Sequence, residues 1–256
     1  MDHKKHILSY TRRAVDDYQM IRPGDKIAVG VSAGKDSLAL LCAMAALKRF
    51  YPTPFELVAI TVDMGFEGGS DFSPIAKLCE ELEVPYKVVP SEIAKIIFDI
   101  RKEPNPCSLC AKLRRGALHN AAKAEGCTSV ALGHHFDDAV ETFMLNLFYE
   151  GRIGCFQPVT YLSRVGLYVI RPLLYAPEKE VAAFAKEADL PVIPSSCPAD
   201  ENTQRESMKQ LLAQLERSNK GLRHRIFGAM QRGEIDGFHV PTRRPLVFPE
   251  PQEGDE

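Results

Sequence analysis

The sequence predicts an α/β protein with a doubly wound parallel sheet, an N-terminal helix and a C-terminal helical extension. Apolar runs rich in Val and Ile alternate with segments of helical periodicity over the first 150 residues, as in parallel sheets whose two faces are both covered. Two of these strands end in short polar motifs that open the next helix. Ligands of such sheets bind at the carboxyl ends of the strands.

The elements are expected in the following order. An amphipathic basic helix at 3–20 ends before the turn at Pro23-Gly24. The alternating part comprises strand 26–31, helix 36–50, strand 56–63, helix 73–83, strand 86–90, a short helix near 91–98, a loop at 101–109, helix 110–125, strand 128–132 and helix 136–149. A last strand at 168–170, helix 177–188 and helices at about 204–217 and 220–231 follow. We divide the chain into an N-terminal helical segment (1–25), a core domain (26–175), a C-terminal helical extension (176–244) and a disordered tail (245–256).

The composition is that of an ordinary globular protein, with 45% hydrophobic residues, 26% charged residues and a formal net charge of −2. No run approaches the ~18 uninterrupted apolar residues of a membrane span, and the basic start lacks the apolar core of a signal peptide. Seven irregularly spaced cysteines indicate thiols or metal ligands rather than a disulfide framework. We therefore expect a cytoplasmic protein that contacts no membrane.

The loop Ser32-Ala-Gly-Lys-Asp-Ser37 joins the first expected strand to the next helix. Small residues let the backbone approach an anion, and the exposed N–H groups and dipole of the helix start favour phosphate. Lys35 can bind phosphates as a point charge. The spacing differs from the usual nucleotide P-loop, which would require glycine at Val29. An ordinary strand–helix turn rich in small residues is the alternative.

A second junction carries Gly133-His-His-Phe-Asp-Asp138 between an expected strand and helix. Two acids in a first helical turn also fit simple interaction with the helix dipole, and the histidines fit a loop.

A third motif, Cys107-Ser-Leu-Cys110, stands at a helix start, where the dipole lowers thiol pKa. With Cys197 it suits a four-iron cluster that leaves one iron open, zinc with a fourth ligand, or, as a pair alone, a redox disulfide. We interpret Cys42, Cys79 and Cys127 as structural residues, and the role of Cys155 stays undecided.

The loop at 32–37 resembles the PP-loop of the ATP pyrophosphatases, which usually has Gly where this chain has Ala33. The whole series of motifs resembles the TtcA-type tRNA 2-thiocytidine synthetases, a group of PP-loop tRNA sulfurtransferases. The resemblance covers about residues 10–232. The motifs that carry it are Tyr18-Gln-Met-Ile21, the loop at 32–37, Cys107-Ser-Leu-Cys110 with Leu113-Arg-Arg-Gly116, Gly133-His-His-x-Asp-Asp138, Asn146-Leu-Phe-Tyr149, Ile170-Arg-Pro-Leu173, Pro191-x-Ile-Pro194 and Asn202-x-Gln-Arg205.

The resemblance implies an adenine nucleotide alpha hydrolase-like fold and an enzyme that uses ATP, Mg²⁺ and a [4Fe–4S] cluster. The implied reaction replaces O2 of an anticodon-loop cytidine with sulfur. It assigns catalysis to Lys35, Asp36, Asp137 and Asp138, and cluster ligation to Cys107, Cys110 and Cys197. The nucleotide site would comprise Ser32, Ala33, Gly34, Lys35, Asp36, Ser37, Val62, Asp63, Met64, Gly133, His134 and Arg171. The family often has a second Cys-x-x-Cys where this chain has Ser195-Ser196-Cys197.

The expected partners are the tRNA anticodon loop and a sulfur donor, either a cysteine desulfurase or free sulfide, with a homodimer as the candidate assembly. Residues 201–244 contain nine Lys/Arg and five Asp/Glu. This excess of basic residues favours contacts with RNA phosphates, although a solvated helical face would have the same composition.

Two alternative functions stay open. One is another PP-loop enzyme, such as a lysidine synthetase or a thiolase for a different base or small molecule, which would not need the three cysteines. The other is a zinc-stapled, non-catalytic RNA-binding protein, which would not need the Lys-Asp and Asp-Asp pairs.

Overall fold

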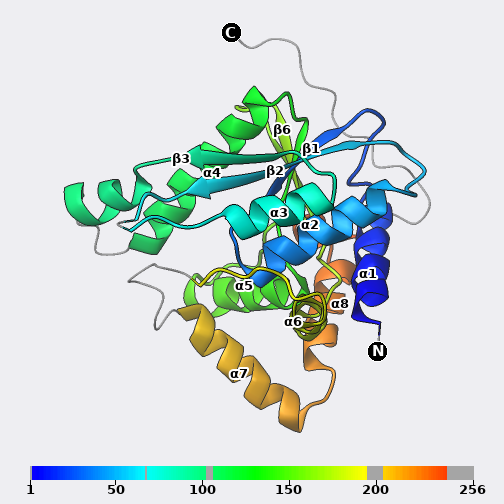
Figure 1. The fold of residues 1–256 in the computed structure, drawn as a ribbon. Coiled ribbons are helices and arrows are strands. Elements are labelled where there is room, and N and C mark those ends of the chain that lie inside the picture. The colour runs from blue at the N-terminus through cyan, green and yellow to red at the C-terminus, as the bar shows by residue number, and fades with distance from the viewer. Residues whose placement is uncertain (1, 67, 102–105, 195–203, 241–256) are drawn as a thin grey trace.

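Six strands form one sheet in the order β3-β2-β1-β4-β6-β5 (Figure 1). The computed structural model describes residues 2–66, 68–101, 106–194 and 204–240. Neighbouring strands are parallel except for β5, which runs antiparallel to β6 at the edge. This sheet confirms the expected doubly wound class. The strands are β1 (Lys26–Gly30), β2 (Glu56–Asp63), β3 (Tyr86–Pro90), β4 (Ser129–Ala131), β5 (Val159–Leu162) and β6 (Leu167–Ile170).

Eight α-helices lie within the described residues: α1 (His3–Asp17), α2 (Lys35–Lys48), α3 (Ser73–Glu81), α4 (Pro106–Ala124), α5 (Phe136–Tyr149), α6 (Glu178–Glu187), α7 (Gln204–Ser218) and α8 (Leu222–Arg232). A π-helical turn at Lys95–Ile100 and a 3-10 turn at Ile235–Gly237 complete the described helical elements. Helix α4 starts earlier than expected because Pro106 fits a first helical turn, where its missing N–H is not needed.

Alternating side chains divide the sheet into two covered faces. Ala28, Val58 and Val130 point to one face and pack with Leu118 and Ala122 of α4. The intervening strand residues, Ile27, Val29, Leu57 and Ala59, point to the opposite face and its larger core. This division follows from the two-residue period of a strand, and it explains why the strands lack polar alternation.

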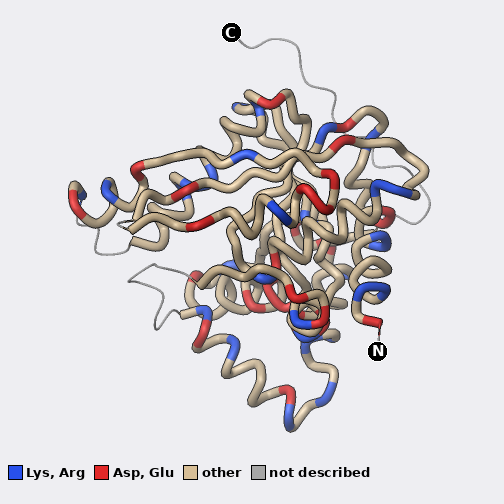
Figure 2. Tube along the Cα trace, in the orientation of Figure 1, with Lys and Arg blue, Asp and Glu red and all other residues tan. Residues whose placement is uncertain are grey.

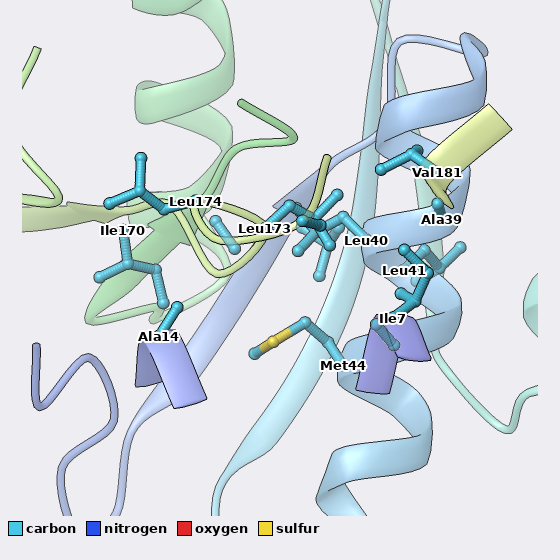
Figure 3. Close-up of a cluster of buried hydrophobic side chains, with 14 of the residues drawn as sticks. Ile7, Ala14, Ala39, Leu40, Leu41, Met44, Ile170, Leu173, Leu174 and Val181 are labelled. Carbon is cyan, nitrogen blue, oxygen red and sulfur yellow. The ribbon is translucent and has the colours of Figure 1, made fainter. Parts of the chain in front are cut away.

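The larger core joins helices from both ends of the chain. Ile7 and Ala14 of α1 lie with Leu40, Leu41 and Met44 of α2 and with Val181 of α6 (Figure 3). Helices α7 and α8 add further side chains to the same cluster: Met208, Leu212, Phe227 and Met230. The N- and C-terminal helices are therefore packed onto the sheet domain. Among the described residues, no helix combines the length and apolar character needed to cross a bilayer.

Strand β5 was not expected from the sequence. It has four half-buried residues and pairs with β6 through a tight connection that includes Gly166 at φ +71°. A four-residue edge strand carries too little periodicity to be recognised locally. The expected tail at 245–256 and the loop residue Cys197 lie outside the described residues.

Candidate functional site

The two predicted nucleotide motifs meet at the point where the strand order reverses. Strands β1 and β4 are adjacent and parallel, and the chain proceeds from β1 toward β3 but from β4 toward β6. Their carboxyl ends therefore flank the crevice where such sheets bind ligands. The approach is close at Gly133, where an added Cβ would lie 3.0 Å from the Asp36 carbonyl carbon and 3.1 Å from the Ser37 nitrogen. Glycine is required there by contact with the neighbouring loop.

The loop after β1 is held by its own hydroxyl groups. Ser37 Oγ donates to the Gly34 carbonyl (2.9 Å) and accepts from the Ser32 backbone N–H (3.1 Å). Ala33 takes the left-handed conformation at φ +64°, so the conformation that glycine favours is kept although a methyl group is present. The carbonyl of Ala33 also accepts the backbone N–H of Ile193 (3.1 Å).

We expect Ala33→Gly to stabilise the protein. An L-residue in this conformation costs about 1–2 kcal/mol, and the greater freedom of glycine in the unfolded chain cancels about half of that gain. The free energy of unfolding, measured by urea denaturation, should rise by about 0.5–1 kcal/mol. The matched control is Ala46→Gly inside α2, which should lower stability by about 1 kcal/mol. Equal destabilisation by both changes would contradict the conformational argument.

Lys35 lies at the start of α2 between two carboxylates. Its Nζ is 3.0 Å from Asp36 Oδ1 and 3.3 Å from Glu178 Oε1 of α6. Partial burial disfavours the ammonium, but the two carboxylates outweigh that effect and raise the pKa of Lys35 above its usual value. The side chain therefore stays positively charged at the strand end where phosphate is expected.

The acids of the second motif are oriented locally by a capping box. The His135 backbone N–H donates to Asp138 Oδ2 (2.9 Å), and the Asp138 N–H donates to His135 Nδ1 (3.3 Å). Asp137 Oδ2 accepts the backbone N–H of Glu178 (2.7 Å). One acid thus fixes the start of its own helix, and the other fixes the start of α6.

Basic residues of the C-terminal helices pair with these acids. Figure 2 marks the Lys and Arg positions along α7 and α8 in blue. Arg205 lies 2.7 Å from Asp138, Arg223 lies 2.9 Å from Asp137 and 3.4 Å from Glu141, and Lys209 lies 2.7 Å from Glu178. Sequence reasoning offered these three basic residues to RNA phosphates, whereas the structure turns them toward the site. The sequence analysis did not identify Glu141 or Glu178 as site residues. The position of Glu141, one helical turn after Asp137, could have placed it on the same helix face, whereas no local sequence pattern points to Glu178.

Arg223→Ala should lower the free energy of unfolding by about 2–3 kcal/mol, because it leaves buried carboxylates without their partner. Asp137 and Glu141 are 13% and 4% exposed at the side chain, and burial already raises the pKa of Glu141. Arg225→Ala on the same helix is the control, since Arg225 is exposed and donates to the carbonyl of Lys220. Urea denaturation would contradict this prediction if the two variants lost equal stability.

Arg171 and His134 both pack against the ring of Phe156. Arg171 is 8% exposed, stacks 4.8 Å from the Phe156 ring centroid and donates to the Gln157 carbonyl. The His134 ring lies 4.9 Å from the same ring. Arg171 Nε and His134 Nδ1 are buried and make no hydrogen bond within the described structure. Among the described residues, Arg171 is therefore a buried side chain rather than a member of a surface salt bridge.

Stability should fall below neutral pH through His134. Burial, helped by the Arg171 charge, lowers its pKa to about 4. The unfolded chain therefore binds more protons between pH 6.5 and 4, so stability present at pH 7 is lost as pH falls through this window. We expect a loss of about 1–2 kcal/mol between pH 7 and pH 5 from this group. His134→Gln should reduce that loss in urea titrations at both pH values; an unchanged loss would contradict the assignment.

Val62, Asp63 and Met64 lie at the carboxyl end of β2, beside the loop that follows β1. The Asp63 carbonyl accepts the Ser91 hydroxyl (2.6 Å), and the Met64 carbonyl accepts the Ala94 N–H (2.9 Å). Their backbone groups therefore support the neighbouring chain, and the expected contact with adenine stays a prediction.

The thiol pair lies one turn apart on α4, with Cys107 exposed and Cys110 half-buried. Cys197 lies outside the described residues, so its distance from this pair is not given by the structure. The remaining four cysteines are kept protonated by burial, which raises the pKa of Cys42, Cys79 and Cys127 to about 11 and that of Cys155 to about 12. Cys155 donates its S–H to the Ala139 carbonyl (3.4 Å), which assigns it to the core.

Comparison with known proteins gives a consistent set of relatives. The PP-loop domain family matches residues 6–216. The chain is 40% identical over 230 residues to the tRNA-cytidine(32) 2-sulfurtransferase of Geobacter sulfurreducens, covering 88% of this chain and 89% of the relative. It is 40% identical to the same-named protein of Syntrophotalea carbinolica, covering 92% and 91%. Among solved structures, the U34-tRNA thiolase NcsA from Methanococcus maripaludis with its [4Fe-4S] cluster superposes with a TM-score of 0.73 at 27% identity, covering 91% of this chain and 83% of that one.

Proposed function

Since the chain belongs to the PP-loop family and to its tRNA-cytidine(32) 2-sulfurtransferases, we propose that it thiolates a cytidine of the tRNA anticodon loop at the expense of ATP. A carbonyl oxygen is a poor leaving group. In the proposed reaction, O2 of the cytidine attacks the α-phosphorus of ATP, and pyrophosphate leaves. Sulfide then attacks C2, and AMP departs with the original oxygen, leaving 2-thiocytidine.

The loop at 32–37 would hold the departing phosphates. Its helix N-terminus presents backbone N–H groups, Ser32 and Ser37 present hydroxyls, and Lys35 supplies a fixed positive charge. Arg171 adds a buried guanidinium with an unused Nε donor. These groups stabilise negative charge where it develops, which is the main task of a site that releases pyrophosphate.

The donor atoms fit the two metal groups that this chemistry uses. Asp36 Oδ1 is buried and accepts no hydrogen bond in the described structure, although Lys35 lies nearby; such an oxygen fits Mg²⁺, which would neutralise the phosphates. Asp137 and Asp138 already have arginine partners, which favours Asp36 as the first ligand. Thiolates of Cys107, Cys110 and Cys197 would hold a [4Fe–4S] cluster, which supplies an open iron for sulfide.

The observation that carries the proposal is that both flanks of residues 195–203 are attached to the nucleotide site. Ile193 donates its backbone N–H to Ala33, and Arg205 pairs with Asp138. The described residues before this segment are thus anchored at the phosphate loop, and those after it are anchored at the motif of residues 133–138. This arrangement favours a sulfur-bearing site next to the activated base over a lysidine synthetase-like activity or a non-catalytic zinc-stapled protein.

Two measurements test the proposal. Mass spectrometry of tRNA from a strain that lacks the gene should show no 2-thiocytidine, and the wild-type gene should restore it. Protein purified without oxygen should be brown and contain about four irons per chain. Colourless protein with stoichiometric zinc, or unchanged tRNA in the deletion strain, would contradict the proposal. The thiolate chemistry and a tRNA substrate also favour a reducing cytoplasm. The sulfur donor and the homodimer stay predictions.

A further inference from the structure

Two histidines and a glutamate gather outside the nucleotide site, where α1 packs on α6. His3 Nδ1 lies 3.0 Å and His6 Nδ1 lies 3.1 Å from the same oxygen, Oε2 of Glu180. Ligand atoms of all three side chains lie within 4.8 Å of one another. The side chains of His3 and His6 are 23% and 45% exposed, against 15% for Glu180, so the cluster is accessible from solvent on its histidine side.

We propose that His3, His6 and Glu180 bind a divalent ion of borderline softness, with Zn²⁺ as the ion of choice. Imidazole nitrogens favour such ions over Mg²⁺ and Ca²⁺, which take oxygen ligands. In a tetrahedral zinc site, metal–ligand bonds of about 2.0–2.1 Å separate neighbouring ligand atoms by about 3.3 Å. The two His–Glu distances are already close to that value. Three protein ligands leave the fourth position to water.

The ligands are held in place before any ion binds. His3 and His6 lie one helical turn apart, so their side chains share a face of α1. The His3 backbone N–H donates to Glu187 of α6 (3.2 Å), and Ile7 of α1 and Val181 of α6 lie in the same buried core (Figure 3). Both backbones are thus fixed, and an ion would replace hydrogen bonds between the same side chains.

The site would act as a structural staple rather than in the proposed reaction. Glu178 and Glu180 are two residues apart on α6 and point in different directions. Glu178 faces Lys35, whereas Glu180 faces α1. An ion at Glu180 would therefore join α1 to the first turn of α6, the turn whose Glu178 N–H is bound by Asp137.

The test uses the full-length chain, stripped of metal with EDTA and titrated with Zn²⁺ by calorimetry. His3→Ala/His6→Ala should bind one zinc fewer per chain than wild type. Glu180→Gln should bind this zinc at least about 100-fold more weakly, because loss of even an outer-shell partner costs about 10- to 100-fold. At zinc a hundredfold above Kd, the wild-type Tm should rise by about 5 °C relative to the double variant. Co²⁺ separates this site from the thiols, because nitrogen and oxygen ligands give no sulfur charge-transfer band.

The matched control is His239→Ala, which removes another histidine that lies near a glutamate, Glu234 (3.8 Å). It should bind zinc as wild type does. Equal zinc stoichiometry and equal sulfur-free Co²⁺ spectra in wild type and the double variant would overturn the proposal. So would a double variant that loses the same stability with and without zinc, because the cluster would then hold only hydrogen bonds.

Discussion

Lys35→Met should lower the rate of tRNA-dependent pyrophosphate release about a thousandfold, the upper end of the loss seen when one fixed donor to a developing charge is removed. Methionine keeps the length and much of the volume of lysine but has no charge. Lys35 is held at the helix start by Asp36 and Glu178, and those carboxylates keep its pKa raised. The charge is therefore in place before ATP binds, and its loss should affect the rate more than the fold.

Two control variants separate this role from packing. Lys35→Arg keeps the charge and should retain part of the rate. Lys209→Met removes the other lysine that pairs with Glu178 but lies on α7, so it should leave most of the rate. Pyrophosphate release should be followed with tRNA and ATP both saturating. A wild-type rate in Lys35→Met would exclude Lys35 from the phosphate site.

The parts of the site that sequence reasoning found are those encoded by neighbouring residues. The loop at 32–37 and the motif at 133–138 are each recognisable from a short run of residues between a strand and a helix. The strand order brings both to one crevice. The sequence analysis placed both motifs at strand ends of a doubly wound sheet but did not predict the strand order, which the structure supplies. The antiparallel edge strand β5 escaped because four half-buried residues in a hairpin show neither a long apolar run nor helical spacing.

The pairings that sequence reasoning missed join residues distant in the chain. Arg223 meets Asp137 across 86 positions, and Arg205 meets Asp138 across 67. No local pattern distinguishes an arginine that pairs with a buried acid from one on a solvated face. Ala33 shows the opposite case: alanine disfavours positive φ, yet the surrounding loop imposes φ +64° on it. Tertiary contacts there override the residue's own preference.

Cys107→Ala and Cys110→Ala should each abolish tRNA thiolation. Both thiols stand one turn apart at the start of α4, and removing one of three ligands should lower the iron content from the about four irons expected of a complete cluster. Pyrophosphate release should continue, because the phosphate loop is on another element. Loss of thiolation with retained pyrophosphate release distinguishes these variants from Lys35→Met, which should lose both pyrophosphate release and thiolation.

Cys127→Ala is the matched control, since burial raises the pKa of this thiol to about 11 and keeps it a protonated core residue. It should keep iron and thiolation at a modest cost in stability. Cys197→Ala should behave like Cys107→Ala if the third thiolate completes the ligand set. Thiolated tRNA, measured by mass spectrometry, should then be missing in all three ligand variants and present in the control. Thiolation retained after loss of Cys107 or Cys110 would separate sulfur transfer from the α4 thiol pair, and retention in Cys197→Ala alone would require a different third ligand.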